Sequence, residues 1–214
     1  MGARFLDDEA RASFKEAVES IEATSSVEVV IAVRRRSASY LHANLIVGAC
    51  TAFAGLAAML FSAYPFSLTA ILFDPFVAGA IAGGLVELAP HLKRWLTPRS
   101  VRIRRVEHAA RAAFVDRGVH NTVDRSGLIV YIGWLEQHVA LVADSNLERT
   151  WTPEARQRAE RALTVAMSAG GVAVARVLAG LAPAFADAMP RGEGDLNELP
   201  DAVDSDMSAA WRRR

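Results

Sequence analysis

The chain has 214 residues, of which 52% are apolar, 7% aromatic and 22% charged, and its 24 basic residues balance 24 acidic ones. This aliphatic content excludes a wholly disordered chain, the single Cys50 excludes a disulfide-stabilised scaffold, and the neutral charge argues against a nucleic-acid binder. The mean hydropathy of +0.18 is high for a soluble domain, so part of the chain is expected to avoid water.

The first 36 residues predict one helix and one strand. Asp7 or Asp8 can cap a helix that runs to about Ala23, with apolar side chains recurring along one side. Residues 27–33 are mostly apolar and rich in valine, which predicts a strand. A lone helix and strand cannot build a hydrophobic core, so their partners must lie later in the chain.

Residues 37–73 contain no Asp, Glu, Lys or Arg. A straight helix of that length would measure roughly 55 Å, well beyond the ~30 Å hydrocarbon core of a bilayer, so the segment must fold back on itself. Pro65 is the natural break, which predicts membrane-spanning helices over about 41–64 and 67–92. A cleavable signal peptide fits poorly, because a helix and a strand precede the apolar run.

Basic residues flank this predicted transmembrane hairpin at both ends, while its turn is uncharged. The positive-inside rule then predicts that both termini are cytoplasmic. We expect the flanking basic side chains to contact lipid headgroups rather than nucleic acid. They are Arg34, Arg35, Arg36, Lys93, Arg94 and Arg99.

Asp74 and Glu87 interrupt the second predicted span. They lie about 20 Å apart along a helix, so they cannot both sit outside a ~30 Å hydrocarbon core that the helix crosses between them. In one arrangement Asp74 caps the helix, Pro75 enters its first turn and Glu87 is immersed; the Asp-Pro pair favours this. In the other, Asp74 is immersed and Glu87 reaches the inner interface beside His91 and Arg94. Intramembrane acids are functional candidates, but we favour the plainer interpretation that a protonated Glu87 pairs with His91 or Arg94.

Gly79 and Gly83 form a GxxxG pattern in the same span. Such small residues let helix backbones approach closely, either inside the hairpin or in a homodimer. Packing within the hairpin is sufficient to explain them.

The remainder of the chain supplies the missing partners. It predicts a helix over 104–117, two strands over 128–132 and 138–143, and two helices that end near Ser168 and Met189. This order predicts one α/β domain, formed by residues 1–36 and 97–190, with the transmembrane hairpin 37–96 inserted. Residues 191–214 are expected to form an acidic, loosely ordered tail.

Polar side chains gather at predicted strand ends. Asp144 ends one strand, Asp124 and Arg125 precede another, and Glu28 lies on the first. Open α/β sheets place ligands at strand ends, and carboxylates that converge there can bind a divalent cation such as Ca²⁺ or Mg²⁺. We favour a plainer interpretation, in which Asp124 and Arg125 form a solvated turn, Asp144 is a cap and Glu28 pairs with an arginine. The sequence contains no familiar nucleophile, phosphate-loop or zinc-protease motif.

A series of short motifs along the chain indicates which family it resembles. They are TSSVEVV at 24–30, FVDRG at 114–118, TVDRSGLIVY at 122–131, LEQHV at 135–139, VAD at 142–144 and DLNELPD at 195–201. In their order and spacing they resemble the TPM domain family, in its bacterial variant with two transmembrane helices inserted in the domain. The resemblance implies a three-layer α/β/α fold and a bacterial inner-membrane location. Some members are reported as acid phosphatases, or are linked to metal ions and to the assembly or repair of membrane complexes.

One departure concerns the loop after Asp144, where the family commonly continues with Arg-Gly-Ile and this chain has Ser145, Asn146 and Leu147. We therefore expect a non-catalytic module that binds or scaffolds other membrane proteins, with self-association left open. The alternative is a metal-assisted, acid phosphatase-like hydrolase that works from Asp124 and Asp144. A third hypothesis makes the hairpin itself functional through Glu87.

Overall fold

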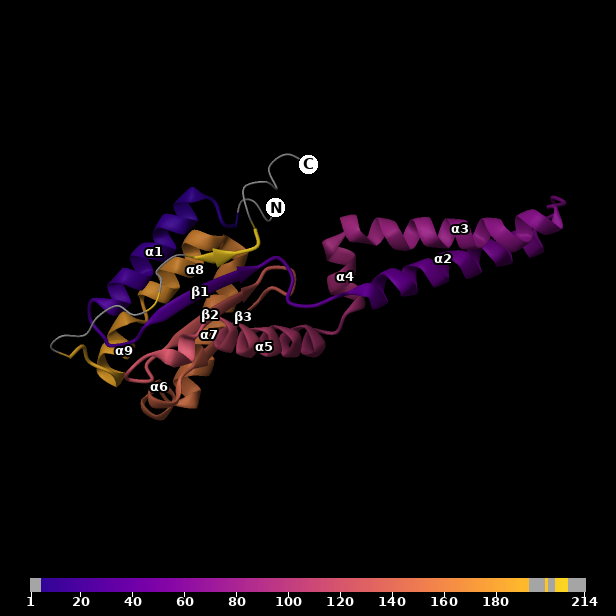
Figure 1. Cartoon of the computed structure of the whole chain (residues 1–214). Coiled ribbons are helices and arrows are strands. Elements are labelled where there is room, and N and C mark those ends of the chain that lie inside the picture. Colours follow the sequence, from indigo (N-terminus) through magenta and orange to yellow (C-terminus); the bar gives the residue numbers. More distant parts are fainter. Residues whose placement is uncertain (1–4, 193–198, 200–202, 208–214) are drawn as a thin grey trace. The chain divides into compact units, whose positions relative to one another are not determined.

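The computed structural model describes residues 5–192, 199 and 203–207. The chain divides into two compact units, which are seen in Figure 1. The α/β unit comprises Met1–Ser37 and Ile103–Arg214, and the hairpin unit comprises Ala38–Arg102. The second division falls inside a helix, α5 (Arg99–Asp116), which begins five residues earlier than the sequence predicts.

Within the described residues, the α/β unit contains one mixed four-stranded sheet in the order β3-β2-β1-β4. The strands are β1 (Val29–Arg34), β2 (Leu128–Gly133), β3 (His138–Ala143) and β4 (Asp204–Ser205). Strand β1 runs parallel to β2 and β4, whereas β2 and β3 form an antiparallel hairpin. Every residue of β2 is buried, as its continuous apolar run predicts, and the α/β class is confirmed.

Helices pack against this sheet, and the buried side chains form two clusters (Figure 1). Besides α5 they are α1 (Asp8–Glu22), α6 (Ser145–Thr150), α7 (Pro153–Ala166), α8 (Gly171–Ala179) and α9 (Ala182–Ala188), with short 3-10 turns at Val119–Asn121 and Met167–Ala169. On one face, side chains of α1, α7, α8 and α9 pack with Ile31 and Val130. On the other face, Val106 and Ala110 of α5 pack with Tyr131. Helix and sheet thus supply the core that the first 36 residues lack.

The helix boundaries in this unit follow local chemistry that the sequence reveals. The carboxylate of Asp7 accepts a hydrogen bond from the amide of Ala10 at 2.9 Å and begins α1. The hydroxyl of Thr152 accepts from Ala155 and begins α7. Gly118, with a φ of 67°, follows the end of α5 in the left-handed conformation that favours glycine.

A short part of the predicted tail pairs with the sheet. Asp204 and Ser205 form β4 beside β1, because Asp204 lies between the guanidinium groups of Arg34 and Arg117 and is ion-paired with both. Residues 193–198, 200–202 and 208–214 lie outside the described residues, and most of the DLNELPD motif is among them.

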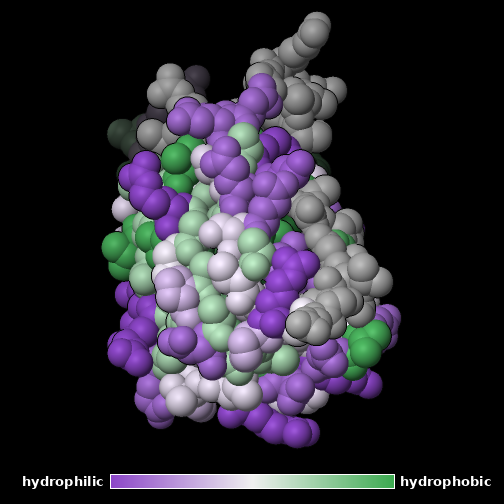
Figure 2. Space-filling model, turned by 90° about the vertical axis from the view of Figure 1, so that its left-hand side faces the viewer, coloured by the Kyte–Doolittle hydropathy of each residue, from purple (hydrophilic) through white to green (hydrophobic). Residues whose placement is uncertain are grey.

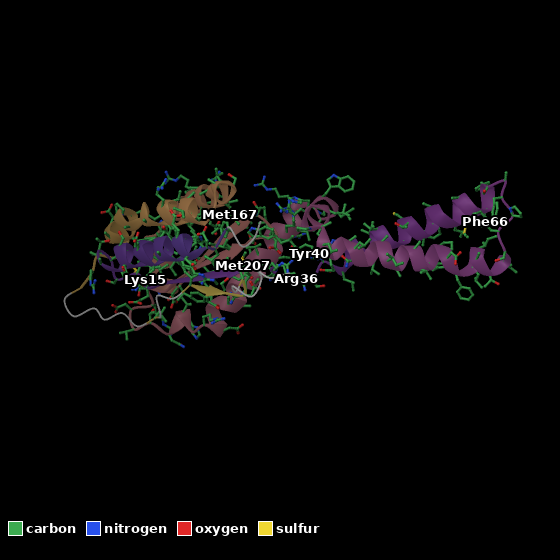
Figure 3. The ribbon with its side chains drawn as sticks, turned by 90° about the horizontal axis from the view of Figure 1, so that it is seen from above. Lys15, Arg36, Tyr40, Phe66, Met167 and Met207 are labelled. Atoms are coloured by element: carbon green, nitrogen blue, oxygen red, sulfur yellow. The ribbon has the colours of Figure 1, made fainter. Side chains whose placement is uncertain are left out.

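The hairpin unit contains two long apolar helices that pack along each other (Figure 1). They are α2 (Leu41–Phe61) and α3 (Leu68–Leu85), followed by a 3-10 turn at Val86–Leu88 and by α4 (Pro90–Leu96). The turn between α2 and α3 contains Pro65, as predicted, and Phe66 lies at its tip (Figure 3). The apolar helices α8 and α9 belong to the α/β unit, where their buried side chains form part of the hydrophobic core.

The favoured arrangement for Asp74 is wrong. The hydroxyl of Ser67 caps α3 by accepting from the amide of Ala70, so Asp74 and Pro75 lie inside the helix. Pro75 is tolerated there on the side that faces α2, where it lies against Gly55: a Cβ on that glycine would sit 3.5 Å from the Cβ of Pro75. Asp74, on the adjacent side of the helix, is exposed.

The glycines of α3 pack within the hairpin. A Cβ at Gly79 would lie 2.6 Å from the carbonyl oxygen of Gly48, and one at Gly83 would lie 2.8 Å from the carbonyl oxygen of Asn44. Both distances are too short for a real side chain. The GxxxG pattern therefore sets the close approach of α2 and α3.

Three helices of the described chain are long and apolar enough to cross a membrane: Leu41–Phe61, Leu68–Leu88 and Gly171–Ala188. The third differs from the other two because Val174, Leu178 and Phe185 are fully buried in the core of the α/β unit. Its apolar character is explained by packing against α1 and the sheet.

Candidate functional site

The structure brings together two of the loops that carry the predicted site. The amide of Asp144 donates to the carbonyl of Gly127 at 2.8 Å, and the amide of Asn146 donates to the carbonyl of Arg125 at 3.2 Å. The side-chain amide of Asn146 also donates to the carbonyl of Asp124 at 3.0 Å. Arg125 adopts a left-handed backbone with a φ of 51°, and its guanidinium donates to the carbonyl of His120. Arg125 therefore shapes the loop that carries Asp124.

Asp144 is the most unusual member of this cluster. Its side chain is buried, and Oδ1 accepts a hydrogen bond from the amide of Ser145 at 2.6 Å, which begins α6. Its Oδ2 is also buried and has no hydrogen-bond partner in the described structure. A buried carboxylate oxygen without a partner is unfavourable, and a ligand or a water molecule would relieve it.

The described side chains around Asp144 do not form a complete ligand set for a divalent cation. Within residues 5–192, 199 and 203–207, no three His, Cys, Asp or Glu side chains lie close enough together to hold a metal ion. Calcium takes six to eight oxygen ligands, so Asp144 would need main-chain carbonyls and water to complete a site. Cation binding by Asp124 and Asp144 stays a prediction.

Glu28 lies at the same end of the sheet. Its side chain is buried, and Oε2 accepts a hydrogen bond from the amide of Leu199 at 3.2 Å. Its main-chain carbonyl accepts from the amide of Leu128, where β2 begins. The carboxylate of Glu28 thus links the start of β1 to Leu199 in the C-terminal segment.

The strand directions correct one step of the sequence argument. Asp144 follows β3, which is antiparallel to β2, so it lies beside the amino ends of β1 and β2. Open α/β sheets bind ligands at the carboxyl ends of parallel strands. The predicted cluster is therefore at the opposite end of the parallel pair from the usual ligand edge.

The carboxyl ends of β1 and β2 hold a polar cluster that the sequence analysis missed. The carboxylate of Glu136 is buried, and its Oε1 accepts from the amide of Ser37 at 2.8 Å. A Cβ at Gly133 would lie 2.8 Å from Oε2 of Glu136 and 2.9 Å from Oγ of Ser37, so only glycine leaves room for both. Burial raises the pKa of the nearby Tyr131 phenol, which the Ser37 hydroxyl lowers and the Glu136 carboxylate raises.

A charged cavity of about 540 Å³ borders the outer edge of β3. Its charged lining residues are Glu107, Arg111, Glu148, Glu154, Arg156 and Glu160. Because β3 ends the sheet, the outward amides of Val139 and Leu141 have no strand partner; they donate to Thr164 and Glu160 of α7 instead, at 3.1 and 3.0 Å. Burial raises the pKa of Glu160, the bond from Leu141 and the charge of Arg156 lower it, and Glu107 raises it.

The two acids of the hairpin unit have different surroundings. Oε1 of Glu87 lies 2.7 Å from Nζ of Lys93 and accepts from the side-chain amide of Asn44 at 3.1 Å. Sequence spacing predicts His91 or Arg94 as the partner of Glu87. It does not reveal Lys93, because a 3-10 turn at Val86–Leu88 separates α3 from α4. Asp74 forms no hydrogen bond or ion pair with any residue that the structure describes.

The basic residues predicted to contact lipid headgroups differ in their partners and in their exposure. The guanidinium of Arg34 is ion-paired with Asp204 in the sheet, and Lys93 is engaged by Glu87. Arg35, Arg36 and Arg99 are exposed, and Arg94 is half-buried. Arg34 therefore has a structural role in the α/β unit that its position in the sequence conceals.

No family model matches this chain, and no curated protein matches it either. Among solved structures, the chain is similar to the NMR structure of the BA42 protein from the psychrophilic bacterium Bizionia argentinensis, with a TM-score of 0.56. The similarity covers 94% of this chain and 95% of that chain, at 11% sequence identity. At this identity the likeness shows the fold alone.

Proposed function

We propose that this protein is a membrane-anchored, non-catalytic module that binds or scaffolds other membrane proteins. In this proposal α2 and α3 cross a bacterial inner membrane as a hairpin inserted into a three-layer α/β/α domain of the TPM type. Both termini lie in the cytoplasm, where the α/β unit meets its partners.

The distribution of exposed apolar side chains carries the proposal. All the large exposed hydrophobic residues of the described chain lie between Leu41 and Trp95, except Val115, Val123 and Val165. Exposed apolar surface on this scale, along helices of membrane-spanning length, is typical of a surface that faces lipid. On the face of the molecule seen in Figure 2, in contrast, hydrophilic side chains predominate around a strip of weakly hydrophobic ones, and strongly hydrophobic side chains lie in small separate groups.

The two ends of the hairpin unit support the proposed orientation. The turn at residues 62–67 carries no charge, and its Tyr64 and Phe66 rings pack edge to face at 5.0 Å. The other end holds the Glu87–Lys93 ion pair and a hydrogen bond between His42 and Thr97. A charged end flanked by arginines suits the cytoplasmic interface, and an aromatic, uncharged turn suits the opposite one.

The layering and family parts of the proposal have separate support. Helices contribute to a core on each face of the sheet, as a three-layer domain requires. The TPM resemblance rests on the motifs of the sequence, and the similar fold of the BA42 protein is compatible with any function.

A second candidate function, a metal-assisted phosphatase-like hydrolase, is favoured by the buried Oδ2 of Asp144. A divalent cation bound there would supply a Lewis acid next to a phosphate ester. In this alternative Asp144 and the carbonyls of the Asp124 loop would hold the cation. The departure from the family pattern at Ser145, Asn146 and Leu147 weighs against it.

One comparison separates the two functions. Hydrolysis of a simple aryl phosphate by the purified full chain is measured with Ca²⁺ and with Mg²⁺, alongside Asp144→Asn and, as a control, the exposed Asp116→Asn. A non-catalytic module predicts no turnover above that of Asp144→Asn, together with no cation binding by calorimetry. Turnover that falls by about 100-fold or more in Asp144→Asn alone would establish the hydrolase.

A further inference from the structure

Asp74 is the only charged side chain between Arg36 and Glu87. It lies seven residues after Ser67, which caps α3, and thirteen residues before Glu87. At 1.5 Å per residue these separations are about 10 and 20 Å. If the Glu87–Lys93 pair marks one interface of a ~30 Å hydrocarbon core, Asp74 lies about 10 Å inside the other.

The side of α3 that carries Asp74 faces away from α2. Pro75, Gly79 and Gly83 are the buried residues of α3, and Gly79 and Gly83 touch the backbone of α2. At 100° per residue, Asp74 is roughly 140° around the helix from Gly79. Val77 and Ile81, on the same side as Asp74, are exposed. The outward surface of α3 is therefore an apolar strip with a single carboxylate in it.

Unlike Glu87, Asp74 has no opposite charge beside its carboxylate among the described residues of the hairpin unit. Glu87 lies against the ammonium group of Lys93 and the amide of Asn44. Asp74 has neither a basic nor a hydrogen-bonding partner among the described residues. Ionisable groups at this depth in a membrane are rare and are almost always paired with one another or face a protein interior.

A second copy of this chain cannot balance the charge. The span holds no lysine or arginine, so a symmetric contact through this side of α3 would bring two Asp74 carboxylates together. The complementary charge must come from a different protein.

We propose that Asp74 docks α3 onto a transmembrane helix of another membrane protein that carries a lysine or arginine at the same depth. The ion pair forms between the carboxylate of Asp74 and that cation, and Val77 and Ile81 pack beside it. This inference rests on the proposed membrane anchoring and specifies the chemistry of the partner.

The test uses the full chain in phosphatidylcholine vesicles. A donor dye is attached to a cysteine at the exposed position of Ser20 in a Cys50→Ser background. The probe is a synthetic leucine–alanine transmembrane helix with an acceptor dye and one lysine about 10 Å below the interface. The matched peptide has glutamine in place of lysine. Energy transfer then measures association in the bilayer.

We expect the lysine peptide to bind about tenfold more tightly than the glutamine peptide, in keeping with polar contacts between transmembrane helices. Asp74→Asn should abolish this preference, whereas Glu87→Gln should retain it because Glu87 already has partners in the hairpin. Equal binding of both peptides to the wild-type chain overturns the proposal. So does energy transfer between copies of the chain that is lost in Asp74→Asn, because a second copy would then be the occupant.

Flotation of the same vesicles distinguishes a failure of the docking proposal from a failure of the membrane anchoring. A chain that floats with the vesicles but shows no lysine preference contradicts the docking proposal alone. A chain that does not float contradicts the membrane anchoring and the docking proposal together.

Discussion

Glu160 shows how one side chain can protect the edge of a sheet. Its Oε1 accepts from the amide of Leu141, an outward amide of the edge strand β3. Thr164, one helical turn later, accepts in the same way from Val139. Satisfied edge amides cannot recruit a strand from another chain, so α7 prevents edge-to-edge association.

This arrangement predicts a pH dependence of stability. Burial raises the pKa of Glu160 above its ordinary value of 4.5, so the folded protein binds this proton more tightly than the unfolded chain does. The stability contribution is therefore greatest below about pH 4.5 and falls as the pH rises through the folded-state value. Glu160→Gln keeps an acceptor for Leu141 without the buried charge, and it should melt at a higher temperature than the wild type at pH 7.

Thermal unfolding followed by circular dichroism, at pH 7 and pH 4, checks this expectation. The advantage of Glu160→Gln should shrink at the lower pH, and the exposed Glu16→Gln should show no advantage at either. A variant that melts below the wild type at pH 7, or an advantage independent of pH, would mean that the ionised carboxylate stabilises the fold.

For single residues, helix N-caps can be predicted from the sequence more reliably than buried acidic side chains. Asp7 and Thr152 are identified correctly because a cap depends on neighbours three residues away. Glu136 sits in a turn between two strands, where an acid is expected to face water. Its burial depends on the amide of Ser37, which is 99 residues away in the chain. No local pattern contains that information.

At the scale of elements, the close packing of α2 and α3 depends on glycines that touch backbone. Adding side chains at Gly83 should separate the helices, because a Cβ there would meet the carbonyl of Asn44 at 2.8 Å. Gly84 is the matched control, since a Cβ there meets nothing within 4 Å.

Gly83→Val should therefore loosen the hairpin while Gly84→Val leaves it intact. Overpacking of this kind destabilises by about 1–3 kcal/mol, so amide exchange in α2 and α3 should become roughly 5- to 150-fold faster in Gly83→Val. Hydrogen-exchange mass spectrometry of the full chain in detergent gives the comparison. Equal exchange in the two variants would show that the glycine contacts do not hold the helices together.

Long elements with a clear pattern are predicted well, and short ones are not. The core helices and the three longer strands follow from periodicity and from capping residues. Strand β4 has two residues and forms through the ion pairs of Asp204, which no periodicity reveals. The start of α3 was misplaced because Asp74-Pro75 resembles a helix start, whereas Ser67 supplies the cap.

For the whole molecule, the order of elements predicts that residues before and after the hairpin join in one sheet, and β1 does pair with β2. The candidate site is less predictable, because strand direction decides which loops share an edge. Asp144 reaches the amino end of β1 and β2 only because β3 turns back against β2.

Cys50 reports directly on whether the hairpin unit lies in lipid. Cys50 is exposed on α2, ten residues into the predicted span, and it is the only cysteine of the chain. Maleimides react with the hydrated thiolate, so a thiol surrounded by lipid should be protected. A cysteine at Ser20 in a Cys50→Ser background is the control for a site in water.

The decisive measurement is the labelling of Cys50 by a charged maleimide in native membranes opened to expose both faces, before and after solubilisation in denaturing detergent. If the hairpin unit lies in lipid, Cys50 stays unlabelled until the membranes are dissolved, while the control cysteine at position 20 is labelled throughout. Rapid labelling of Cys50 in undissolved membranes, at the rate of the control, would contradict the placement of the hairpin unit in lipid.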